Sequence, residues 1–135
     1  MKTFKLTAFS AVCALVLSTS AFGATVMSKT DYKAAKEKIE VQHESAETAC
    51  KAMSDNAKDV CEKGAKGNEK VAKAELEQSY KPSTKHMKKV AEEKNDLVYS
   101  VAKEKCDDQT GDAKDACVTQ AKADHQKGEV EIKAM

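Results

Sequence analysis

The sequence predicts an all-α protein of three or four long helices, forming two disulfide-closed helical hairpins in an elongated bundle or a loose coiled coil. Three observations support this. Ala, Glu, Lys and Leu make up close to half of residues 24–135, a composition typical of long solvated helices. Four cysteines recur at one repeated spacing, with turn-forming residues inside each pair. Val, Ile, Leu and Phe are too scarce for a sandwich, a barrel or an α/β domain.

Residues 1–24 of the 135-residue chain have the features of a cleaved signal peptide. A basic start, an apolar run over residues 6–17 and a group of small residues before Ala24 follow one another. The rival interpretation is a retained membrane anchor, which the short apolar run and the missing basic stop-transfer flank disfavour. We therefore expect a periplasmic helical domain over residues 25–135, without a transmembrane segment.

The first helical segments can be followed along the chain by their apolar periodicity. Residues 29–53 carry a weak heptad seam. Residues 57–79 continue as a lysine-rich helix that Gly64 and Gly67 weaken. Pro82 then either starts a new helix or kinks a long one. Because of this ambiguity, the sequence leaves open whether the two hairpins pack together or lie end to end.

The second half of the chain repeats this organisation. Residues 84–106 are the most apolar stretch, and apolar positions spaced by three and four run from Met87 to Ala102. Residues 113–127 are expected to form the last helix, and the chain from Gly128 onward is expected to fray. The alternative is that Val130 and Ile132 extend an amphipathic tail. The predicted hairpin units are therefore about residues 29–80 and 84–127.

The cysteines belong to an internal repeat. The four that follow the leader form two pairs, each with a separation of eleven residues: Cys50 with Cys61, and Cys106 with Cys117. The second pair follows the first by 56 residues, and seven of seventeen positions are identical between residues 50–66 and 106–122. We interpret this as a duplication of one helical-hairpin unit.

Each cysteine pair encloses a turn with residues suited to capping the next helix. Asn56 and Asp112 are good N-cap candidates. Asp59 and Asp115 then fall three positions into the helix, where a carboxylate faces free N–H groups and the positive helix end. Gly111 suits the left-handed residue that closes the preceding helix. We therefore expect a helix end, a short turn and a helix start within each pair.

These turns place the two cysteines of a pair on neighbouring antiparallel helices, within bridging range. Export also places the chain where disulfides persist. Four cysteines allow three pairings, of which we favour Cys50–Cys61 and Cys106–Cys117 because partners close in sequence meet early. A gap of ten residues does not fit a structural zinc site, and the chain has no Cys-x-x-Cys redox pair or haem-attachment motif. We therefore expect neither metal nor cofactor.

The charged residues limit the classes of partner. All 23 basic residues are lysines, and 22 acidic residues nearly balance them. Without arginine and without an aromatic platform, nucleic-acid binding has little support. One lysine cluster is a candidate contact patch: Lys81, Lys85, Lys88 and Lys89. The patch could meet another envelope protein or an anionic envelope surface, and a solvated helix face is the simpler interpretation.

The two cysteine blocks also resemble a known group of proteins. They carry Cys50…Ala57-Lys58-Asp59-x-Cys61 and Cys106…Ala113-Lys114-Asp115-x-Cys117, each followed by Ala-Lys, with Tyr80-Lys81-Pro82 between them. This arrangement resembles small exported bacterial proteins that are loosely described as TolA-like cell-envelope proteins, over most of residues 30–127. The resemblance implies a periplasmic helical protein.

The chain lacks catalytic motifs, since it has no nucleophile elbow, phosphate loop or metalloprotease signature. His43 and Glu47 share a helix face, which we interpret as a solvent-facing pair rather than two metal ligands. We therefore expect a non-catalytic periplasmic protein with a structural or protein-interaction role in the cell envelope. The alternative is a stress-responsive periplasmic chaperone or a ligand- or metal-sensing module.

Overall fold

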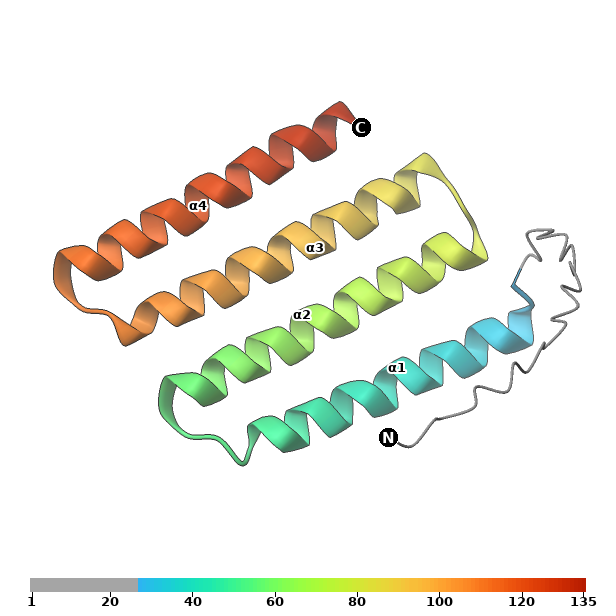
Figure 1. Ribbon diagram of the computed structural model, residues 1–135. Coiled ribbons are helices and arrows are strands. Elements are labelled where there is room, and N and C mark those ends of the chain that lie inside the picture. The colour runs from blue at the N-terminus through green and yellow to red at the C-terminus, as the bar shows by residue number, and fades with distance from the viewer. Residues whose placement is uncertain (1–26) are drawn as a thin grey trace, which may run out of the picture.

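Four antiparallel helices lie side by side in the order of the chain (Figure 1). The structure, a computed structural model, describes residues 27–135, and the expected signal peptide lies outside the described residues. The elements are α1 (Lys29–Cys50), α2 (Asp55–Tyr80), α3 (Thr84–Lys105), the short 3-10 helix η1 (Cys106–Asp108) and α4 (Gly111–Ala134). The predicted all-α fold of helical hairpins is confirmed.

The helices form an open layer rather than a closed bundle. α1 packs on α2, α2 on α3 and α3 on α4, and the other pairs among these described helices barely touch. Pro82 separates α2 from α3, and Ser83 caps α3 by accepting a hydrogen bond from the backbone N–H of His86 at 3.1 Å. The two hairpins therefore pack together through α2 and α3, which settles the alternatives that Pro82 had left open.

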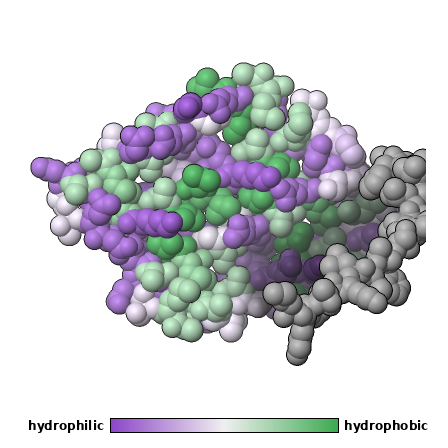
Figure 2. All heavy atoms as spheres, viewed as in Figure 1, coloured by the Kyte–Doolittle hydropathy of each residue, from purple (hydrophilic) through white to green (hydrophobic). Residues whose placement is uncertain are grey.

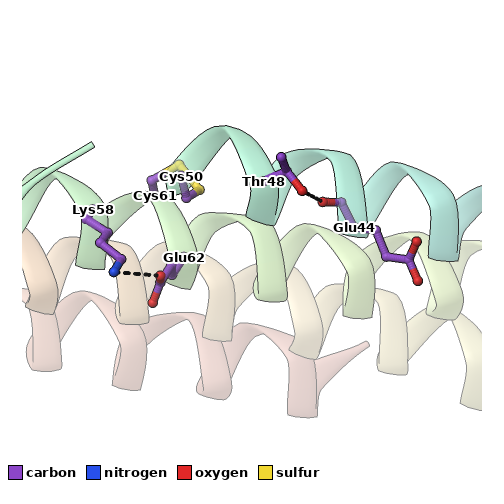
Figure 3. The surroundings of a disulfide bond; sticks show 6 residues. All are labelled: Glu44, Thr48, Cys50, Lys58, Cys61 and Glu62. Atoms are coloured by element: carbon purple, nitrogen blue, oxygen red, sulfur yellow. Dashed lines mark hydrogen bonds and ion pairs between the residues drawn. A yellow bond between two sulfur atoms is a disulfide. The ribbon is translucent and has the colours of Figure 1, made fainter. Parts of the chain in front are cut away.

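Both predicted disulfides are present and lie at the same end of the layer. Cys50–Cys61 joins α1 to α2, and Cys106–Cys117 joins η1 to α4, with Cα–Cα distances of 5.5 and 5.7 Å. Figure 3 shows the first bond beside the hairpin turn, where it connects the last residue of α1 to the second turn of α2. Each hairpin is thus covalently closed, whereas the α2–α3 contact depends on non-covalent interactions.

The interior of the layer is thin because each helix has only one or two neighbours. The fully buried side chains among the described residues are Cys50 and Cys106. The remaining buried hydrophobic residues are mostly small: Ala65, Ala74, Leu76, Ala121 and Ile132. No polar or charged residue of the described part is buried. Disulfides therefore supply stability that a larger hydrophobic core would otherwise provide.

The last helix is longer than expected. The predicted fraying from Gly128 onward is wrong, because α4 continues to Ala134 and buries Ile132. Gly128 also lies where α4 approaches α3 closely: a Cβ at this position would come within 2.6 Å of Asn95 Cγ. The glycine that suggested a helix end in the sequence instead permits close packing of two helices.

The predicted helix caps are also wrong. The N-cap positions are Ser54 and Thr110, so that Asn56 and Asp112 lie inside the first turn, and Asp59 and Asp115 lie three residues further on. The reason is that each chain reversal is completed earlier than expected, by a residue with positive φ: Asp55 (52°) and Gly111 (58°). Gly111 has the predicted left-handed conformation, but it begins α4 rather than closing the preceding helix.

Candidate interaction surface

A groove opens between α2 and α3 at the end of the layer where residues 81–83 connect these two helices. We call this the connector end. The volume of the groove is about 500 Å³. Its lining comes from two helices and the end of the chain: Glu75, Gln78 and Ser79 of α2, Met87, Val90, Ala91 and Lys94 of α3, and Met135 after α4. Met87 is 43% exposed and Met135 50%. Two flexible, polarisable side chains therefore lie free at the edge of this groove.

A second groove follows toward the disulfide end, with a volume of about 420 Å³. It lies between the same two helices and is lined by Gly64, Asn68, Leu97, Val98, Val101, Ala102 and Lys105. Val98 is 65% exposed even though apolar residues surround it. The α2 side of this groove is formed by a glycine and an asparagine, so that the backbone of α2 is accessible to a close approach.

The two grooves lie along one side of α3. Their α3 residues recur every three or four positions, which is the spacing of a single helix face. We call Met87, Ala91, Val98 and Ala102 the apolar stripe. Lys94 interrupts it at the middle, where its Nζ lies 2.6 Å from Glu75 Oε1 of α2. The charges of Lys94 and Glu75 at the centre of the stripe are therefore paired within the chain.

The opposite side of the α2–α3 contact has a different character. The residues that line it are mostly charged: Lys63, Lys66, Lys70, Glu93 and Asp96, with Gly67, Leu97 and Ser100 between them. Lys63 Nζ also pairs with Glu104 Oε2 at 3.6 Å. Figure 2 shows one face of the molecule, on which small hydrophobic patches are separated by hydrophilic side chains. The α2–α3 pair thus has one apolar and one charged side.

The predicted lysine patch lies at the connector end, but its members have different contacts. Lys81 Nζ lies 5.3 Å from the ring centroid of Tyr80, and Lys88 Nζ donates to the backbone O of Lys133 at 3.2 Å. Lys89 Nζ lies 2.9 Å from Glu93 Oε1, and this hydrogen bond raises the pKa of Lys89. Lys85 is exposed in the first turn of α3. Lys81, Lys88 and Lys89 therefore each contact a group of the same chain, and this leaves less positive charge for a partner.

Each histidine of the outer helices contacts an acidic residue of the neighbouring helix. On the α1–α2 contact, His43 Nε2 lies 3.3 Å from Glu47 Oε1 and 3.6 Å from Glu69 Oε2. On the α3–α4 contact, His125 Nε2 lies 2.7 Å from Asp96 Oδ1, and its ring stacks on Tyr99 at 4.6 Å. The prediction that the His43–Glu47 pair faces solvent is wrong for His43, because its side chain is only 18% exposed and lies on the α1–α2 contact, where Glu69 is its second partner. Within residues 27–135, no group of three His, Cys, Asp or Glu side chains is arranged to hold a metal ion.

A tyrosine pair joins α1 to α2 near the connector end. The Tyr32 hydroxyl donates to the Glu77 carboxylate, and its ring lies 4.5 Å from that of Tyr80. The hydrogen bond to Glu77 raises the pKa of Tyr32. Tyr32 lies within the heptad seam predicted over residues 29–53, but the sequence does not identify Glu77 as its partner, because 45 residues separate the two.

Within residues 27–135, no helix combines the length and apolar character needed to cross a membrane. Comparisons with protein-family models, with curated proteins and with solved structures find no match to this chain. The geometry of the described residues is therefore the basis for assigning a function.

Proposed function

We propose that this protein is a non-catalytic helical module of the cell envelope that binds a protein partner through the apolar stripe of α3. The observation that carries the proposal is the exposure of Val98 and Met87 along two grooves that follow one helix face. Exposed apolar side chains that gather along one helix face, here interrupted by the Lys94–Glu75 pair, are typical of an interaction site. A groove between two helices suits an amphipathic helix of the partner.

The rigidity of the platform supports binding. Each hairpin is closed by a disulfide at one end, and α2 and α3 approach closely at Gly67 and Leu97. A groove whose walls are already fixed loses little conformational entropy when a partner binds. The charged side of α2 and α3 remains available to keep the layer hydrated.

The proposed compartment is the periplasm. Two disulfides are consistent with an oxidising environment, and the leader-like composition of residues 1–24 gives a route of export. Osmotic-shock fractionation followed by mass mapping of the intact chain tests this directly. The expected mass is that of a chain beginning near residue 25, with no free thiols at the four cysteines. An unprocessed, reduced chain in the cytoplasmic fraction would contradict the proposed location.

Site-specific photo-crosslinking tests the binding surface. A photoreactive amino acid replaces Val98 in the full precursor, and in a matched control it replaces Val41 of α1, whose exposure of 64% is close to the 65% of Val98. We expect discrete crosslinked products with envelope proteins or with the chain itself from position 98, and none from position 41. Equal products from both positions, or none from either, would refute the proposed surface.

The chaperone alternative is favoured by one observation. Met87 and Met135 line the larger groove and are both exposed, and methionine side chains adapt to partners of different shape. In this case the oxidised chain suppresses aggregation of a reduced, unfolding client protein, and Met87→Lys removes this effect. A chain that forms one discrete crosslinked product and leaves client aggregation unchanged excludes the chaperone alternative.

A further inference from the structure

The apolar stripe is complementary to itself when one copy is reversed. Along α3 its order is Met87, Ala91, Val98 and Ala102, with large and small side chains alternating. An antiparallel second copy centred between Lys94 and Asn95, the midpoint of α3, places Met87 opposite Ala102 and Ala91 opposite Val98. Both contacts pair a large with a small side chain, which is the arrangement that packs without voids.

The charges at the centre have the same symmetry. Lys94 and Glu75 form a 2.6 Å ion pair beside the midpoint of the stripe, and both side chains are about half exposed. A two-fold axis at this point brings Lys94 of one copy near Lys94 of the other, and each lysine is neutralised by Glu75 of its own chain, so that two neutral pairs meet at the axis. A partner with a uniformly acidic or basic surface would lack this match.

The face formed by α2 and α3 is close in area to one side of a standard dimer interface. α2 and α3 contain 26 and 22 residues, and helices of this length extend about 33–39 Å and pack about 8–10 Å apart. Together they present a face on the order of 700 Å², close to the roughly 800 Å² that each partner buries in a standard interface. A second layer would also cover the side that the open layer leaves exposed.

We infer that two copies of this chain associate through their apolar stripes, antiparallel about a two-fold axis at the middle of α3. The inference rests on the proposed function, because it uses the same surface, and it names the partner as a second copy. The dimer would be a two-layered helical assembly in which Val98 of each copy packs on Ala91 of the other.

Sedimentation velocity of the processed, fully oxidised chain tests this inference over about 1–100 µM, the range in which the weaker interfaces of this size dissociate. The wild type is expected to sediment as a dimer at the upper end. Val98→Lys is expected to raise the dissociation constant tenfold or more. Val41→Lys, an equally exposed valine of α1, is expected to leave it unchanged. Circular dichroism establishes that both variants remain folded.

A charge exchange adds a second test. Lys94→Glu places four carboxylates at the axis and is expected to weaken the dimer, whereas the double variant Glu75→Lys/Lys94→Glu restores two neutral pairs and is expected to recover it. A wild-type chain that stays monomeric at every concentration overturns the inference. The inference is also overturned if the double variant dimerises no more tightly than Lys94→Glu, or if Val41→Lys weakens the dimer as much as Val98→Lys does.

Failure of this inference is distinguishable from failure of the proposed function. If the chain is monomeric but position 98 crosslinks to a different envelope protein, the surface is correct and the second copy is the wrong partner. If position 98 gives no product at all, the proposed function fails as well.

Discussion

Gly67 of α2 lies so close to Leu97 of α3 that a Cβ at position 67 would come within 3.2 Å of Leu97 Cβ and Cγ and closer still to its terminal methyl group. In the sequence, this glycine counts only as a weak point of a helix. In the structure, it sets the distance between the two helices that carry the apolar stripe, and Gly67 itself is buried. The contact is therefore where the hairpins are held together without a covalent bond.

Replacing Gly67 and Gly64 by alanine should have opposite effects. At position 67 the added methyl group forces the helices apart, which costs about 1–3 kcal/mol, more than the gain of about 1 kcal/mol in helix propensity. At position 64 no atom lies within 4 Å of the new Cβ, so only the propensity gain of about 1 kcal/mol is expected. Urea unfolding measures both. A stabilised Gly67→Ala protein would contradict the close approach.

The positive φ of Gly111 should make this position intolerant of a side chain. Gly111→Ala forces an L-residue into the left-handed region at φ 58°, which costs about 1–2 kcal/mol. Asp55 occupies the same place in the first hairpin at φ 52°, and Asp55→Gly should relieve a similar strain. Part of that gain is offset, because Asp55 also interacts with the positive end of α2. Thermal unfolding measures the stability of both variants. If Gly111→Ala is as stable as the wild type, the turn adopts another conformation.

Each disulfide should contribute about 3 kcal/mol by restricting the unfolded chain. The double substitution Cys50→Ala/Cys61→Ala removes the first bond, and Cys106→Ala/Cys117→Ala removes the second. Because both loops have the same sequence separation of 11 residues, we expect similar losses in the free energy of unfolding. Denaturant titration of each variant provides the measurement, and a loss below about 1 kcal/mol for either pair would contradict the entropic account.

Acid should weaken the contact around Glu69. The hydrogen bond from Lys73 Nζ at 2.6 Å lowers the pKa of the Glu69 carboxyl below its usual 4.5, and the nearby His43 acts in the same direction. A lowered pKa in the folded state means that the carboxylate stabilises the protein above pH 4.5 and that this contribution is lost as the pH falls through the folded pKa. Glu69→Gln should therefore flatten the fall in melting temperature between about pH 5 and pH 3.

Two further variants serve as references for the acid experiment. Lys73→Gln removes the same hydrogen bond and should flatten the profile in the same way. Glu62→Gln should change it less, because the pair that Glu62 forms with Lys58 is longer, at 3.9 Å, and exposed. If Glu69→Gln retains the full acid sensitivity of the wild type, the stabilising role of this carboxylate is refuted.

Local features were predictable because neighbouring residues set them. Pro82 has no N–H and restricts its predecessor, so a boundary near it follows from covalent structure. Cys50 and Cys61 lie on either side of a turn, and their proximity follows from that turn. The cap prediction for the first hairpin failed although it too was local, because a non-glycine residue, Asp55, takes the left-handed conformation that reverses the chain. In the second hairpin the left-handed Gly111 was predicted, but it is the first residue of α4, so that the cap is Thr110. Aspartate adopts it only sometimes, and the sequence offers no sign of when.

The sequence by itself determined the all-α class, the two turns enclosed by cysteine pairs and the spacing of the apolar stripe, since all of these depend on residues within a few positions of one another. Only the tertiary structure decided which side of α3 is covered. It also decided that Glu75 meets Lys94, that Tyr32 meets Glu77 and that Asp96 meets His125. These contacts form between residues on different helices. They depend on how closely two backbones approach, which is set by small residues such as Gly67 and Gly128 that carry no periodic signal.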